Sequence, residues 1–203
     1  MKSIILDKQS VIPSKVVCVG RNYVEHIQEL NNEVPTSMVI FMKPNSSITD
    51  TLTVFPHTLH YEGEICFAVK NGKLSAVGFG LDLTNRTLQN ELKGKGLPWE
   101  RAKAFDGAAV LSEFVSISEK EINTLSMHLY INDVLVQEGT IDLMIHKPAS
   151  ILAEIQTFAT FEDNDVIMTG TPKGVSTYEK GDVFVGKIFI DGKEVISQEW
   201  IAK

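Results

Sequence analysis

The sequence predicts a mainly β domain with a few short helices, and three observations support this fold class. Apolar segments are short and rich in Val, Ile and Phe, with turn residues between them. Segments with a strand pattern outnumber those with a helix pattern, and the two kinds do not alternate regularly, which argues against a doubly wound α/β sheet. The length of 203 residues suits a single domain, so we assign residues 1–203 to one folded unit.

Strands are expected wherever a short apolar run is bounded by turn residues. These runs are Val16–Val19, Met38–Met42, Glu64–Val69, Leu74–Leu83, Met127–Ile131, Val134–Gln137, Val166–Met168, Val183–Ile190 and Glu194–Ile201. The pair Asp191-Gly192 separates the last two runs and predicts a hairpin with a type I′ turn. Asn132-Asp133 predicts a second hairpin with a weaker signal.

Helical patterns are few. In Asn22–Leu30 the apolar residues recur at the spacing of one helix face, and Thr84–Leu92 is a second short candidate. A third helix is expected over Pro148–Phe158, because proline fits the first turn of a helix. The stretch Lys93–Leu97 contains two glycines and predicts a mobile loop.

Charge and composition exclude several classes of protein. Lys and Arg number 19 against 26 Asp and Glu, so the net charge is −7 and no basic patch for nucleic acid is present. An acidic chain is repelled by anionic lipid, and no run approaches the roughly 18 apolar residues of a membrane span. Cys18 and Cys66 both lie in apolar runs, which predicts buried, reduced thiols. We therefore expect a cytoplasmic protein.

Three carboxylates form the sharpest chemical feature. Glu62 and Glu64 are two residues apart at the head of a predicted strand, so they share a face. They are either an exposed pair on an edge strand or part of a cation site. Asp82 lies in an apolar segment, where a charge needs a cation or strong donors. Three carboxylates without a supporting Cys or His cluster favour Mg²⁺ or Mn²⁺ over zinc.

Other polar residues are weaker candidates. His26 and Glu29 share a helix face and suit either a general base with its orienting carboxylate or a solvated surface pair. Lys103 is flanked by small and apolar residues, and Arg86 and Gln89 follow Asp82 at helical spacing. The loop from Thr169 to Val175 offers hydroxyls and backbone N–H groups that could hold an anion. Taken singly, each of these features favours a structural role.

Taken together and in order, these segments resemble the fumarylacetoacetate hydrolase family. The matching segments are Val17–Tyr23 with His26 and Glu29, His60–Glu64, Gly80–Arg86, Leu97–Trp99, Ala102–Asp106 and Thr169–Val175. The most similar subgroup is the short, single-domain acylpyruvases with their oxaloacetate decarboxylase or tautomerase relatives. The resemblance implies a mixed β-roll like the C-terminal domain of fumarylacetoacetase. It also implies a homodimer built across sheet edges.

The resemblance also implies roles for individual residues. Glu62, Glu64 and Asp82 would bind one Mg²⁺ or Mn²⁺, and Lys103 would bind the substrate oxygens or the developing enolate. His26 and Glu29 match the dyad that activates water in hydrolases of the family. The substrate pocket would be lined by Arg21, Arg86, Gln89, Gly170 and Thr171.

The expected substrate is a small 2-oxo acid, and several reactions fit the same residues. The dyad favours metal-dependent hydrolysis of the C–C bond of an acylpyruvate, which yields pyruvate and a carboxylate. The alternatives are decarboxylation or keto–enol tautomerisation of oxaloacetate, and an isomerase or decarboxylase of aromatic catabolism. A metal-binding module without catalysis is a further alternative, although it would have no need of Lys103 beside the metal.

Overall fold

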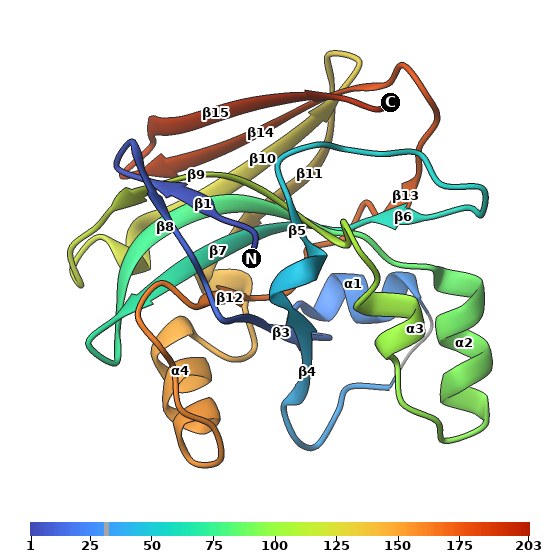
Figure 1. The fold of residues 1–203 in the computed structure, drawn as a ribbon, viewed down its shortest axis with the longest axis horizontal. Coiled ribbons are helices and arrows are strands. Elements are labelled where there is room, and N and C mark those ends of the chain that lie inside the picture. The colour runs from blue at the N-terminus through green and yellow to red at the C-terminus, as the bar shows by residue number, and fades with distance from the viewer. Residues whose placement is uncertain (31–32) are drawn as a thin grey trace.

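Two curled β-sheets pack face to face in the computed structural model, which describes residues 1–30 and 33–203 (Figure 1). The larger sheet has the order β2 (Gln9–Val11), β1 (Ile4–Leu6), β9 (Ala109–Ser116), β8 (Lys73–Asp82), β7 (Gly63–Lys70), β12 (Val166–Met168), β3 (Lys15–Gly20) and β4 (Val39–Pro44), with β5 (Ile48–Thr49) paired to β9. The smaller sheet has the order β11 (Val134–Thr140), β10 (Leu125–Ile131), β14 (Val183–Ile190) and β15 (Lys193–Ile201). A short pair joins β6 (His60–Tyr61) to β13 (Ser176–Thr177).

The main core lies between the two sheets. Ile65 and Phe67 of β7 and Phe79 and Leu81 of β8 pack there, in one cluster with residues of β10, β14 and β15. Phe79 fits against Gly186 of β14 so closely that a Cβ at position 186 would collide with the ring. Because side chains alternate along a strand, Glu64 and Asp82 lie on the opposite face of the larger sheet.

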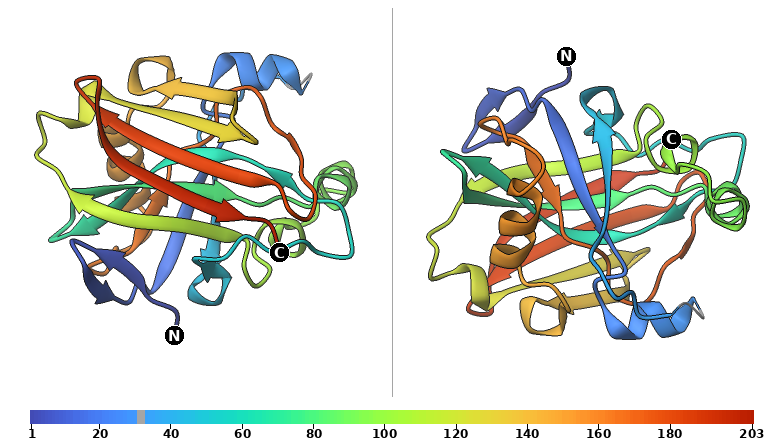
Figure 2. Two further views of the ribbon diagram at one scale, coloured as in Figure 1. Left: turned by 90° about the horizontal axis from the view of Figure 1, so that it is seen from above. Right: turned by 90° about the horizontal axis from the view of Figure 1, so that it is seen from below.

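The helices surround the larger sheet and do not share one of its faces. Figure 2 shows the smaller sheet nearest the viewer from above and α4 nearest the viewer from below. Helix α4 (Pro148–Gln156) packs through Ile151 and Ile155 on Val17 of β3 and Ile167 of β12, which the strand pairing places on the same face as Phe67. Helices α1 (Val24–Glu29), α2 (Arg86–Gly94) and α3 (Glu100–Lys103) lie at one end of the sheet (Figure 1). Three 3₁₀ turns complete the described elements: Asn45–Ser47, Ile122–Thr124 and Ile141–Leu143.

The mainly β fold and the predicted strands are confirmed. Both predicted hairpins have type I′ geometry, because Asn132 and Asp133 have φ of 50° and 64°, and Asp191 and Gly192 have φ of 48° and 75°. The short strands β1, β2, β5, β6 and β13 were not predicted, because two or three residues carry too little pattern. Strand β9 was not predicted either, because Ser112 and Glu113 interrupt its apolar run. Ser112 Oγ accepts a hydrogen bond from Phe79 N (2.8 Å), beside an irregularity in the β8–β9 ladder.

The predicted loop at Lys93–Leu97 is wrong in its first two residues. Helix α2 begins with the Asn85 side chain accepting a hydrogen bond from Leu88 N (3.1 Å) and continues through Lys93 to Gly94. It stops before Gly96, whose φ of 63° is left-handed. Helix α3 was missed because it is only four residues long.

The predictions for the cysteines are confirmed. Cys18 and Cys66 are buried, and neither forms a disulfide. Burial raises the pKa of both thiols well above the ordinary value. Among the helices of residues 1–30 and 33–203, none has the length and apolar character that a membrane crossing requires.

Candidate active site

Three carboxylates converge at the end of the β7–β8 pair. Glu62 precedes β7, Glu64 is its second residue, and Asp82 ends β8; Asp82 N donates to Glu62 O (2.9 Å). One oxygen from each side chain lies within 4.8 Å of the other two. The residues are only 5%, 2% and 1% exposed, so the interpretation of Glu62 and Glu64 as an exposed edge pair is wrong.

Two of these carboxylates already have cationic partners. Arg86 and Lys103 both form ion pairs with Glu62, and Lys103 Nζ lies 2.8 Å from Glu62 Oε2. Burial alone would raise the pKa of Glu62, but the charges of Lys103 and Arg86 hold it well below the usual range. Asp82 Oδ2 accepts from Lys103 Nζ at 2.7 Å, and its Oδ1 lies 2.8 Å from Lys43 Nζ.

Glu64 differs from its two neighbours. Its Oε2 accepts a hydrogen bond from Gly170 N (2.7 Å), and within residues 1–30 and 33–203 it forms no ion pair. Burial, followed by the charges of Asp82 and Glu62, raises the pKa of Glu64 well above its ordinary value. A buried carboxylate in this position requires either a proton or a cation. An all-oxygen donor set with one uncompensated charge fits a hard divalent cation.

Lys103 links two of the carboxylates. Its ammonium donates to Glu62, to Asp82 and to Thr84 Oγ1 (2.6 Å), so all three N–H groups are used. Burial would lower the pKa of Lys103, but Asp82 and Glu62 together raise it above the ordinary value. Lys103 therefore remains a cation beside the carboxylates.

Lys43 is the residue of this cluster that the sequence did not reveal. It is fully buried on β4, and its Nζ donates to the carbonyls of Lys103 and Ala108 (3.1 Å for Ala108) as well as lying beside Asp82. In the sequence it stands before Pro44 at the end of an apolar run, where a lysine is ordinarily exposed. Only the pairing of β4 with β3 brings it beneath Asp82.

The predicted dyad is formed. Gly20 ends β3, and Arg21, with φ of 57°, turns the chain into α1, which carries both residues. His26 Nδ1 lies 3.2 Å from Glu29 Oε2, and Glu29 Oε1 accepts from Gly174 N (2.9 Å). His26 is only 5% exposed, so it is not a solvated surface residue, whereas Glu29 beside it is exposed.

A small cavity of about 30 Å³ is lined both by His26 of the dyad and by Glu62 of the carboxylates. Three predicted substrate-binding residues line it together with catalytic candidates: Arg21, Arg86, Gln89, His26, Glu62 and Lys103. Gly170 and Thr171 lie beside the carboxylates and outside this lining. Thr171 Oγ1 donates to Gly63 O (2.9 Å) and accepts from Gln137 Nε2 (2.8 Å), which fixes the strand between Glu62 and Glu64. Gly170 has φ of 97°, and a Cβ there would lie 2.9 Å from Val19 O.

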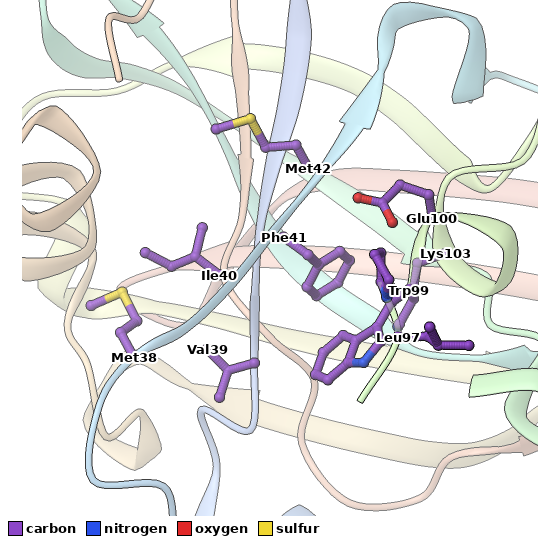
Figure 3. Close-up of a pocket in the computed structure, with 10 residues that line it drawn as sticks. Met38, Val39, Ile40, Phe41, Met42, Leu97, Trp99, Glu100 and Lys103 are labelled. Carbon is purple, nitrogen blue, oxygen red and sulfur yellow. The ribbon is translucent and has the colours of Figure 1, made fainter. Parts of the chain in front are cut away.

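A larger, more apolar cavity of about 450 Å³ adjoins the small one (Figure 3). It lies between β4 and the segment that leads into α3, and Val39, Phe41, Trp99 and Lys103 line both cavities. Figure 3 shows the rings of Phe41 and Trp99 close to one another in this cavity. Through these four residues the larger cavity lies next to the space that His26 and Glu62 line.

Comparison with known proteins identifies the family. Residues 15–195 match the family model described as "Fumarylacetoacetate (FAA) hydrolase C-terminal". The chain belongs to this family. Members of the family with similar sequences include Oxaloacetate tautomerase YcgM of Escherichia coli, 36% identical over 187 residues, covering 83% of this chain and 85% of that protein. The mitochondrial Oxaloacetate tautomerase FAHD1 of Homo sapiens is 34% identical over 185 residues, with coverage of 82% and 83%.

Solved structures of the family share the whole fold. A putative fumarylacetoacetate isomerase/hydrolase from Oleispira antarctica has a TM-score of 0.94 at 34% identity, covering 100% of both chains. Fumarylpyruvate hydrolase from Pseudomonas aeruginosa in complex with Mn²⁺ and pyruvate has a TM-score of 0.88 at 26% identity, covering 99% of this chain and 95% of that chain. The predicted family and its β-roll fold are therefore confirmed, and the chain is an enzyme of this family.

Proposed function

We propose that this enzyme interconverts the keto and enol forms of oxaloacetate with the help of a divalent cation. The observation that carries the proposal is the meeting of His26, Lys103 and Glu62 in one cavity beside the carboxylate cluster. Relatives named oxaloacetate tautomerases, at 36% and 34% identity, support this reaction over the acylpyruvate hydrolysis that the sequence favoured.

Glu62, Glu64 and Asp82 would hold the cation, which is Mg²⁺ or Mn²⁺ by the chemistry of an all-carboxylate site. A relative that binds Mn²⁺ and pyruvate supports a metal-dependent site for a 2-oxo acid. When bound, such a cation withdraws electron density from the 2-oxo group and favours the enolate.

The chain's own residues supply the proton transfer. Tautomerisation moves a proton between C3 and the 2-oxo oxygen and consumes no water. His26, oriented by Glu29, is the base that takes the C3 proton. Lys103 keeps a positive charge at the same cavity, and this charge stabilises the negative charge that develops on the oxygen.

Hydrolysis of an acylpyruvate is the second candidate, because the same dyad can activate water. The relative described as a fumarylpyruvate hydrolase supports it. Decarboxylation of oxaloacetate needs the cation and Lys103 but no base. The three reactions differ in products, so one set of assays separates them.

The test follows enol oxaloacetate by its ultraviolet absorbance and measures pyruvate released from oxaloacetate and from acetylpyruvate. Each assay is run with Mg²⁺ and with excess EDTA. We expect fast ketonisation that EDTA abolishes, with little pyruvate. If pyruvate release from acetylpyruvate is faster than ketonisation of oxaloacetate, hydrolysis is the function and not tautomerisation. No activity on any 2-oxo acid would overturn both proposals.

The homodimer and the cytoplasmic location remain predictions. Strand β4 ends the larger sheet, and Met42 on it is 37% exposed, which supports an association across this edge. Light scattering after size-exclusion chromatography measures the oligomeric state.

A further inference from the structure

Lys93 is a cation of the small cavity that the proposed chemistry does not use. Arg21, Arg86, Lys93 and Lys103 all line this cavity. Arg86 and Lys103 form ion pairs with Glu62. Lys93 forms no ion pair in residues 1–30 and 33–203, and its Nζ lies over the Trp99 ring, 4.9 Å from the centroid.

Helix α2 points Lys93 at the same space as two predicted substrate-binding residues. Arg86, Gln89 and Lys93 are spaced three and four residues apart, so they share one face of the helix. Arg86 lies at the end of the helix next to Glu62. Lys93 lies two turns farther along, so the backbone positions of Arg86 and Lys93 are about 10 Å apart along the helix axis. This face therefore runs from the carboxylate cluster towards the outer wall of the cavity.

Aromatic rings form the wall between the two lysines. Lys103 Nζ lies 5.1 Å from the centroid of Phe41, and the Phe41 and Trp99 rings are 6.0 Å apart. Lys93 contacts the other end of this wall through Trp99. Because Lys93 and Lys103 line the same small cavity, a ligand that enters it and contacts Lys103 also comes within reach of Lys93.

The charges around Lys93 favour an anion. Burial, then the positive charges of Arg21, Arg86 and Lys103, lower its pKa to about 8. Holding a cation among three others is unfavourable unless a negative group joins them. The ordinary partner, Glu62, is already occupied by Arg86 and Lys103. A ligand that brings its own carboxylate would relieve the repulsion.

We propose that Lys93 binds the second carboxylate of the substrate and makes the site select 2-oxo dicarboxylates over 2-oxo acids with a neutral tail. The proposal rests on the proposed function, because it places the first carboxylate and the 2-oxo group at the carboxylate cluster. Lysine suits this role, since its flexible stem carries a point charge that can follow a small anion. An acylpyruvate with an uncharged tail lacks the group that Lys93 would bind.

The test compares two substrates that differ only in the distal charge. Oxaloacetate carries the second carboxylate, and 2-oxosuccinamate replaces it by a neutral amide of the same shape. Lys93→Gln removes the charge, and Lys93→Arg keeps it. Lys95→Gln is the matched control, because Lys95 is exposed, two residues away, and pairs with Glu91 (2.6 Å) outside the cavity.

We expect wild type to prefer oxaloacetate in kcat/KM. Lys93→Gln should lower kcat/KM for oxaloacetate about 10–100-fold, mainly through KM, the usual size of a lost charge-assisted hydrogen bond. The same variant should change kcat/KM for the amide less than about threefold, which is the range of a weak surface interaction. Lys93→Arg should keep most of the preference, and Lys95→Gln all of it.

Equal losses on both substrates in Lys93→Gln, or no loss on either, would overturn the role of Lys93 while the tautomerase function stands. If wild type converts neither substrate, the proposed function fails instead. In that case the shifts in melting temperature that oxaloacetate and its amide cause, with Mg²⁺ present, still decide the role of Lys93. A melting temperature of Lys93→Gln close to wild type without ligand shows that the variant is folded.

Discussion

Lys43 Nζ lies 2.8 Å from Asp82 Oδ1, and both side chains are buried beneath the carboxylate cluster. Lys43 also donates to the carbonyls of Lys103 and Ala108, so one ammonium joins β4, the end of α3 and the end of β8. Through Lys43, the edge strand β4 is therefore connected to Asp82 of the carboxylate cluster.

Lys43→Met should lower the free energy of unfolding by about 3–5 kcal/mol, because it leaves a buried carboxylate with one cation fewer. Urea denaturation at neutral pH measures the change. In an Asp82→Asn background the same substitution should cost clearly less, since the charge it compensated is gone. A loss below about 1 kcal/mol, the size of an exposed pair, would contradict the coupling.

Glu64→Gln should abolish stabilisation by divalent cations. It keeps an acceptor for Gly170 N but removes the carboxylate that lacks an ion pair. At a hundredfold excess over Kd, Mg²⁺ should stabilise wild type by about 2.7 kcal/mol. This stabilisation corresponds to a rise in melting temperature of about 5–10 °C for a domain of this size. Thermal melts with Mg²⁺ and with EDTA measure the shift, and Glu113→Gln, at an exposed position on β9, should behave as wild type. A full shift in Glu64→Gln would remove Glu64 from the ligand set.

His26→Ala should slow tautomerisation about 10²–10⁴-fold, the usual contribution of a general base. Decarboxylation of oxaloacetate should fall far less, because it requires no base. Glu29→Gln should cost less than His26→Ala, since it weakens the orientation of the imidazole without removing it. Rates of both reactions at saturating Mg²⁺ provide the comparison, with His57→Ala, at an exposed position, as the control. Equal losses in both reactions would mean that His26 orders α1 and does not transfer the proton.

Asp165 should make the fold sensitive to acid. Its Oδ1 accepts from Ser14 N and Ser14 Oγ, both at 2.7 Å, and its Oδ2 pairs with Lys15. Burial alone would raise the pKa of Asp165, but these partners hold it below its ordinary value. The folded state therefore binds this proton less tightly than the unfolded state, whose pKa is about 3.9. The contribution is complete above that pH and is lost as the pH falls towards the folded pKa.

Asp165→Asn should accordingly lose about 1.5–3 kcal/mol at pH 7, the range for hydrogen bonds to a charged group. The difference from wild type should shrink below about pH 4, near the pKa of an unfolded aspartate. Denaturation of both proteins between pH 7 and pH 3 measures it. A difference that is constant over this range would show that the charge of Asp165 does not contribute.

The strands and the three carboxylates of the cluster could be predicted from the sequence, because both have local signals. Glu62 and Glu64 share a face by spacing, and Asp82 is conspicuous as a charge in an apolar segment. Lys43 had no such signal, since its burial depends on strand pairing between distant segments. Lys93 was assigned to a loop because two glycines follow it closely. Had the predicted helix ended at Gly94 instead of Leu92, the spacing of four residues would have placed Lys93 on the same helix face as Gln89.

The contact between Phe79 and Gly186 has a consequence for the distances within the site. Phe79 stands three residues before Asp82 on β8, and its ring rests against the bare backbone of the opposing sheet. A larger residue at position 186 would have to move that ring, and with it the strand that carries one of the three carboxylates. The distances between the oxygens of the proposed cation site therefore depend on Gly186, a residue on the far side of the sheet that is not part of the carboxylate cluster.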